Sequence, residues 1–97
     1  MTEASKRNGA ILKNVPELPI AADLWLAVAR EMELSPQHAH VVELVLRGLS
    51  DKQITEAMGI HQSTLRTYFE RISARSGANG RVGILRMVLA LSHKVRR

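Results

Sequence analysis

The sequence predicts an all-α protein, and three observations support this prediction. Apolar residues recur at intervals of three and four in successive segments after position 20, which is the period of an amphipathic helix. Ser35 before Pro36, and Ser50 with Gln53 three residues later, are typical of helix starts. Gly48 and Gly59 stand where helices end, and the connections between the segments have the length of turns in a helix-turn-helix.

Length and composition limit what this chain can do. Its 97 residues allow one small domain, without room for a separate sensor or catalytic domain, so it is either a freestanding small protein or part of a longer one. Three aromatic residues leave little for base stacking, which favours duplex nucleic acid over single strands. Cysteine is absent, which excludes disulfides and thiolate metal sites, and the N-terminus contains no signal sequence or long apolar run. We therefore expect a cytoplasmic protein that does not enter membranes.

The positive charge is concentrated in the second half of the chain. The formal net charge is +5, but positions 1–51 contain 5 basic and 7 acidic residues, a net −2. Positions 52–97 contain 9 basic and 2 acidic residues, a net +7. A basic half of this kind favours a polyanionic partner such as nucleic acid.

Two segments precede the helix-turn-helix. Residues 1–19 have no helical period and contain Pro16 and Pro19, so we expect a disordered tail in which Lys6, Arg7 and Lys13 are more simply solvated than bound to phosphates. Residues 20–33 are expected to form an extra helix that packs on the domain or on a second subunit, with a docking site for another protein as the alternative. Its apolar stripe consists of Leu24, Trp25, Val28, Ala29 and Met32.

The next two helices are defined by their caps and apolar faces. Ser35 and Pro36 begin a helix that ends at Gly48, and its inward face is predicted to contain Val41, Val42, Val45, Leu46 and Leu49. Ser50 and Gln53 form a capping box for a two-turn helix that buries Ile54, Ala57 and Met58 before Gly59. The chain becomes helical again near His61 or Gln62, after a tight turn typical of DNA-binding motifs.

The third helix has one apolar and one polar side. Rotation by about 100° per residue places Leu65, Tyr68, Phe69, Ile72 and Ser76 on one side, and Ser63, Arg66, Thr67, Glu70, Arg71 and Ala74 on the other. Arg66 and Thr67 are predicted to point towards base edges, where an arginine would bind guanine. Glu70 either accepts a hydrogen bond from cytosine or pairs with Arg66, and we favour the pairing. Thr64, Arg71 and Arg75 lie on one flank, where phosphates are expected.

The last segment carries two apolar stripes and therefore requires two partners. Val82, Leu85 and Leu89 form one stripe, and Ile84, Val88, Leu91 and Val95 form the other. One stripe is expected to cover the domain's own core, and we assign the second, Ile84 to Val95, to a homodimer interface. The alternative is a final helix covered entirely by the Trp25 helix and the core.

Residues 34–81 resemble the LuxR/GerE-type DNA-binding domain of bacterial transcription regulators. The similarity covers about half of the chain without a gap, and rests on Leu34-Ser35-Pro36, Val41, Leu44, Gly48-Leu49-Ser50, Lys52, Ile54, Ile60, Thr64, Ile72, Gly77 and Arg81. Five positions depart from the family pattern: His38 and His40 replace usual glutamates, Thr55 a small alanine, Arg66 a usual lysine and Ser76 a core leucine.

The resemblance implies a four-helix domain, here spanning residues 34–97, whose third helix enters the major groove and whose last helix pairs two subunits. It implies base contacts by Arg66, Thr67 and Glu70. The resemblance and the polar face of the third helix together imply contacts with the DNA backbone. These contacts are made by Ser50, Lys52, Ser63, Thr64, Arg71 and Arg75.

The predicted function is sequence-specific binding of double-stranded DNA and regulation of transcription in a bacterium, at the nucleoid. RNA polymerase or another regulator is a candidate for a further partner. The alternatives are a small antagonist that pairs with a full-length regulator through the last helix or the Trp25 helix, and a promoter-recognition domain of sigma-factor type. The four histidines have no metal-ligand spacing, and no catalytic group or glycine-rich phosphate loop is present, so we expect no enzyme activity, metal, cofactor or small-molecule ligand.

Overall fold

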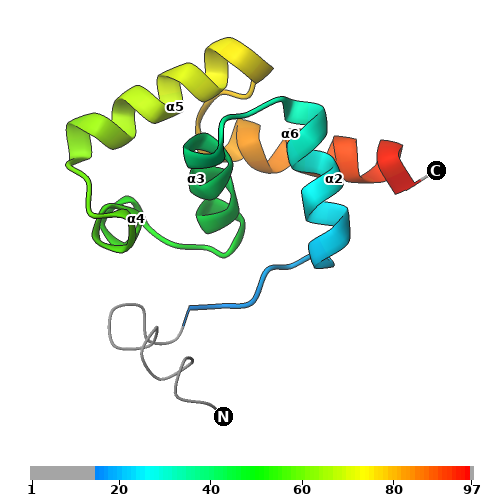
Figure 1. Ribbon diagram of the computed structural model, residues 1–97, viewed down its shortest axis with the longest axis horizontal. Coiled ribbons are helices and arrows are strands. Elements are labelled where there is room, and N and C mark those ends of the chain that lie inside the picture. Colours follow the sequence, from blue (N-terminus) through cyan, green and yellow to red (C-terminus); the bar gives the residue numbers. More distant parts are fainter. Residues whose placement is uncertain (1–14, 97) are drawn as a thin grey trace.

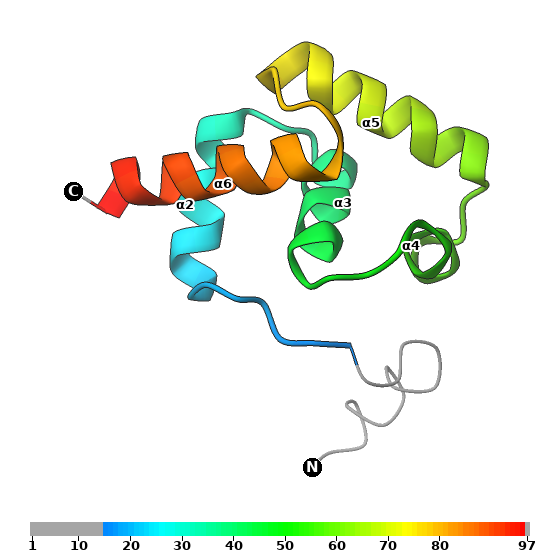
Figure 2. The ribbon, with the colours of Figure 1, turned by 180° about the vertical axis from the view of Figure 1, so that it is seen from behind.

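The structure, a computed structural model, describes residues 15–96 and confirms the all-α fold with an additional N-terminal helix (Figure 1). The helices are α2 (Ala22–Met32), α3 (Pro36–Leu46), α4 (Asp51–Met58), α5 (Gln62–Ser76) and α6 (Gly80–Arg96). Figures 1 and 2 show α3 in the middle of the molecule, with α4 and α5 at one end and α2 and α6 at the other. No helix within residues 15–96 has the length and apolar character needed to cross a membrane.

The predicted caps of α3 and α4 are confirmed. The Ser35 hydroxyl accepts a hydrogen bond from the His38 backbone N–H at 3.2 Å. Ser50 and Gln53 form a reciprocal capping box, with a 3.1 Å bond from the Gln53 N–H to the Ser50 hydroxyl and a 2.9 Å bond from the Ser50 N–H to the Gln53 side chain. These bonds satisfy backbone donors that have no partner inside the helix, and they fix where each helix begins.

One core runs through the whole described structure and includes α2. Trp25, Val28 and Met32 of α2 are buried, and α2 packs more extensively on α6 than on any other helix. The predicted inward faces of α3, α4 and α5 contribute the rest, although Leu46, Ala57, Met58, Tyr68 and Phe69 are only partly buried. The Lys94 ammonium also contacts the Glu31 carboxylate at 3.3 Å across the α2–α6 pair. Residues 20–33 are therefore continuous with the helix-turn-helix domain.

The segment before α2 differs from the expected tail. Val15 and Leu18 are partly buried against the core, and the Arg47 guanidinium donates a 3.1 Å hydrogen bond to the Pro16 carbonyl. Arg47 is itself held by Glu43, one helical turn away, at 3.1 Å. The prolines prevent a helix, but the intervening apolar side chains still pack. Residues 1–14, with Lys6, Arg7 and Lys13, lie outside the described part of the chain.

The assignment of the two α6 stripes is wrong. Ile84 and Val88, assigned to the dimer interface, are 0% and 2% exposed within the single chain, and Leu91 and Val95 are partly buried against the same core. The exposed stripe consists of Val82 (69%), Leu85 (40%) and Leu89 (66%). The physical reason is α2, whose apolar face requires a partner and covers the Ile84 side of α6.

Ser76 has a defined role at the end of α5. Its hydroxyl donates to the Ile72 carbonyl at 2.7 Å and accepts from the Ala78 N–H at 3.2 Å. Gly77 then adopts a φ of 83°, which reverses the chain towards α6. The serine that replaces a usual leucine therefore stabilises the turn after α5 through two hydrogen bonds.

Candidate nucleic-acid interface

The orientation of α5 is set by the turn that joins it to α4. Gly59 ends α4 with a φ of 66°, a left-handed conformation that glycine adopts without steric strain. The Ile60 N–H then donates to the Thr55 carbonyl at 3.1 Å, and His61 is the N-cap residue before α5. The partly buried Ile60 side chain anchors the turn to the core. This short connection between two capped helices is the structural basis of a helix-turn-helix.

The polar side of α5 faces away from the core, as predicted. Leu65 and Ile72 are buried on the inner side, whereas Ser63, Arg66, Glu70, Arg71 and Ala74 are exposed. Ala74 and Ser63 are short, which allows a close approach, and the arginines supply hydrogen-bond donors. An exposed helix with this distribution of side chains can place donors against the floor of a DNA major groove.

Thr67 lies at the centre of the polar face but is partly buried. Its hydroxyl donates a 3.1 Å hydrogen bond to the Ser63 carbonyl, one turn earlier in the helix. A hydroxyl that donates to its own helix retains its acceptor lone pairs and its methyl group. Thr67 is therefore suited to accept from a base amino group or to contact a thymine methyl group.

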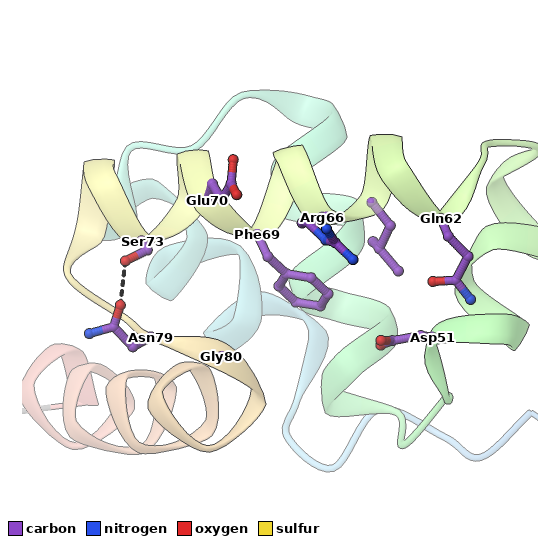
Figure 3. Close-up of a pocket in the computed structure, with 9 residues that line it drawn as sticks. Asp51, Gln62, Arg66, Phe69, Glu70, Ser73, Asn79 and Gly80 are labelled. Carbon is purple, nitrogen blue, oxygen red and sulfur yellow. Dashed lines mark hydrogen bonds between the residues drawn. The ribbon is translucent and has the colours of Figure 1, made fainter.

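Arg66 and Glu70 border a groove on one flank of α5 (Figure 3). The opposite wall consists of Asp51 at the start of α4, of Asn79 in the turn before α6 and of Gly80, the first residue of α6. The predicted pairing of Arg66 with Glu70 is wrong: no ion pair joins them among the residues described, and in Figure 3 the Glu70 carboxylate points away from the Arg66 guanidinium. Both side chains are long and exposed, and a surface pair of this kind gains little free energy.

The walls of this groove are held in place by two contacts between side chains. The Arg81 guanidinium of α6 binds the Asp51 carboxylate of α4 at 2.7 Å. The Ser73 hydroxyl of α5 bonds to the Asn79 side chain at 2.5 Å (Figure 3). Asp51 is the acidic residue closest to the start of α4, and its pairing with Arg81 neutralises negative charge beside Arg66.

The residues predicted to contact the DNA backbone form two groups. Ser50 and Lys52 are exposed at the start of α4, and Ser63 is exposed and Thr64 partly buried in the first turn of α5. Arg71 and Arg75 are exposed in the second half of α5. The Arg75 guanidinium donates a 3.1 Å hydrogen bond to the Glu33 carbonyl, which fixes its position beside the turn between α2 and α3.

The sequence interpretation missed His38. Its ring meets the Tyr68 ring edge-on, with centroids 5.1 Å apart and planes at 64°. It lines a second pocket, on the other flank of α5, together with Arg71 and Arg75. Partial burial, and then the positive charges of Arg71 and Arg75, lower the pKa of His38 below its usual value. The signal in the sequence was the substitution itself, since a histidine at the third position of a helix supplies no negative charge for capping.

The comparisons with known proteins agree with this geometry. Residues 32–88, more than half of the chain, match the family model GerE, described as bacterial regulatory proteins of the luxR family. No curated protein matches the chain. No solved structure matches it either. The match begins at the end of α2 and includes α3, α4, α5 and the first half of α6. The helix-turn-helix is the DNA-binding domain of this family, and the chain therefore belongs to the luxR family of bacterial regulatory proteins.

Proposed function

We propose that this protein binds double-stranded DNA in a sequence-specific manner and regulates transcription in the bacterial cytoplasm, on the nucleoid. The observation that carries the proposal is the polar, exposed side of α5, which the Gly59 turn presents away from the core. In this arrangement α5 enters the major groove, where each base pair presents a distinct pattern of donors and acceptors. The net charge of +7 on positions 52–97 supports binding to a polyanion.

The side chains divide between reading bases and binding phosphates. Arg66 reads a guanine through two parallel hydrogen bonds, and Thr67 and Glu70 contact neighbouring base pairs. The phosphates on both sides of the groove are bound by Ser50, Lys52, Ser63, Thr64, Arg71 and Arg75, which carry no sequence information themselves. Glu70 is available to accept from a cytosine amino group because Arg66 does not occupy its carboxylate.

We further propose that two copies pair through the exposed stripe of α6, Val82, Leu85 and Leu89. Three apolar side chains on one face of a helix are costly to leave in water, and a twofold homodimer is the commonest way to cover such a face. Because α6 follows α5 directly, pairing of α6 fixes the separation of the two α5 helices. The expected operator therefore has two symmetric half-sites about one helical turn apart.

Selection from a pool of randomised duplexes tests the function directly. The purified chain is incubated with the pool at near-physiological salt, and the retained DNA is sequenced. Enrichment of a symmetric motif supports both sequence-specific readout and pairing. Retention without enrichment contradicts sequence-specific readout, and would favour a protein that binds another regulator instead.

Arg66→Ala is expected to relax the preference at one base pair of each half-site. A bidentate arginine–guanine contact discriminates by about 1–3 kcal/mol, so the enriched motif should lose one guanine while the other positions persist. The measurement is competition between the selected duplex and variants with single base-pair changes. Arg30→Ala, which removes an exposed arginine of α2, serves as the matched control and should leave the motif unchanged. An unaltered preference in Arg66→Ala would show that α5 presents a different face to the bases.

Arg75→Ala is expected to weaken binding to all duplexes to the same extent. Loss of one phosphate contact lowers the slope of log affinity against log salt concentration by about one, whatever the sequence. Titrations of specific and random duplexes between low and moderate salt measure this slope. Loss of preference without a change in slope would contradict the assignment of Arg75 to the backbone.

A further inference from the structure

The pocket on the second flank of α5 brings three nitrogen-rich side chains together. Its lining comprises His38 of α3, Arg71 and Arg75 of α5, and the turn from Glu33 to Ser35, with Ala74 between the arginines. Arg71 and Arg75 are four residues apart, so they project from successive turns of the same helix face. The pocket borders the polar face of α5, where the proposed function brings the DNA backbone.

Two of these side chains are held in position before any ligand arrives. The His38 ring is fixed by its edge-on contact with Tyr68, at a centroid distance of 5.1 Å. One N–H of Arg75 is bonded to the Glu33 carbonyl, which leaves the other guanidinium donors available. Prior positioning of this kind reduces the entropy lost when an anion binds.

Two arginines and one glutamate line the pocket around His38. Arg71 and Arg75 face it from α5, together with the neutral Tyr68, and Glu33 lines the pocket from the α2–α3 turn. On α3 itself, Glu43 is occupied by Arg47. Partial burial and the two arginines keep the pKa of the free His38 low, so its ring is predominantly neutral at neutral pH. An anion between the arginines would neutralise their charge and accept a hydrogen bond from a protonated ring.

We propose that this pocket binds one phosphate group of the duplex backbone, and that His38 takes up a proton as the phosphate arrives and becomes its third ligand beside Arg71 and Arg75. The inference rests on the proposed function, since it takes the phosphate from DNA. It adds a residue to the interface and makes DNA binding depend on pH.

The sign of the pH dependence follows from proton linkage. His38 has a low pKa in the free protein and a higher one beside a phosphate, so the complex binds more protons than the free protein. The affinity for DNA therefore rises as the pH falls through the higher pKa of the complex, and becomes constant below the lower pKa of the free protein. A difference of about one pKa unit corresponds to a gain of about tenfold in affinity.

The first experiment measures the affinity for one duplex between pH 8 and pH 5.5 at constant ionic strength, in the unmodified protein, His38→Gln and His40→Gln. His40 is an exposed histidine on the same helix, two residues away, and controls for general effects of charge. Because His61 at the start of α5 also lies near the DNA in this arrangement, the informative quantity is the difference between His38→Gln and the unmodified protein. Between pH 8 and pH 5.5, we expect the DNA affinity of the unmodified protein to rise about threefold to tenfold more than that of His38→Gln. The affinity of His40→Gln should rise as much as that of the unmodified protein. Equal pH profiles for all three proteins would overturn the proposal.

A second measurement observes His38 itself and separates the two possible sources of phosphate. Proton NMR of the histidine rings gives the pKa of His38 alone, with inorganic phosphate, and with duplex. A higher pKa with duplex alone supports a site that requires the DNA backbone, whereas a higher pKa with inorganic phosphate as well supports a site for phosphate groups in general. A pKa that neither addition changes refutes the site. If the protein binds no duplex at any pH, the proposed function fails, while the titration with inorganic phosphate still decides whether the pocket binds phosphate.

Discussion

Replacement of Trp25 by alanine is expected to lower the free energy of unfolding by about 3–5 kcal/mol, the usual range for a large aromatic side chain removed from a core. Trp25 is only 5% exposed and lies on the face of α2 that packs on α6, beside the fully buried Val28. A small domain has a total stability of about 5–15 kcal/mol, so this one substitution should remove a large share of it. Urea unfolding followed by circular dichroism at 222 nm measures the change, since all the described elements are helices.

The neighbouring residue provides a matched control. Leu26 is also a large apolar side chain of α2 but is 60% exposed, so Leu26→Ala should change the stability by no more than about 0.5 kcal/mol. If Trp25→Ala were as stable as Leu26→Ala, α2 would not form part of the core. The expected result also means that residues 32–88, which match the family model, do not form a complete core on their own in this protein. Without α2, the buried Ile84 and Val88 of α6 would be exposed to solvent.

The helix boundaries could be predicted from the sequence because local chemistry determines them. Ser35 before Pro36 and the Ser50–Gln53 box satisfy backbone groups of their own helices, and Gly59 adopts a conformation that other residues rarely adopt. None of these features depends on the rest of the fold. The exposed side of α5 could be predicted for the same reason, since Leu65 and Ile72 define an inner face within a single helix.

The orientation of α6 could not be predicted in this way. Periodicity shows that two apolar stripes exist, but both could cover a core, and the choice depends on which surface α2 offers. The Ile84 stripe faces α2 and the core, and the shorter Val82 stripe is left exposed. That outcome depends on contacts between residues about 60 positions apart, such as Glu31 with Lys94.

The candidate site could be predicted only as far as it is determined within a single helix. Helical rotation identified Arg66, Thr67 and Glu70 as one face but could not determine whether Arg66 and Glu70 pair, because long exposed side chains have many rotamers. His38 belongs to a different helix from Arg71 and Arg75, so no spacing within the sequence relates them. The structure brings these three residues into one pocket through the packing of α3 against α5.

Leu89→Glu is expected to separate the proposed dimer, with the largest effect of any single surface substitution on DNA binding. Leu89 is 66% exposed in the single chain, so a glutamate there is hydrated and the fold should be unaffected. In the pair, the carboxylate would be buried without a partner. Interface residues of this kind contribute about 2 kcal/mol each, and twofold symmetry doubles the effect to about 4 kcal/mol, or about a thousandfold in Kd. Sedimentation equilibrium measures the mass, and titration of duplexes with one or two half-sites measures the effect on binding.

Two further substitutions decide whether the Val82 stripe is the pairing surface. Leu26→Glu places the same charge at a similarly exposed leucine of α2 and should leave the mass and the affinity unchanged. Leu91→Glu places it on the opposite stripe, where Leu91 is partly buried, and should lower the stability of the single chain rather than dissociate a folded pair. A folded, monomeric Leu91→Glu beside a dimeric Leu89→Glu would exclude pairing through the exposed stripe.

A monomeric Leu89→Glu should bind a single half-site as the unmodified chain does, because α5 is unchanged. It should lose the additional affinity for two half-sites, because only a linked pair gains that affinity.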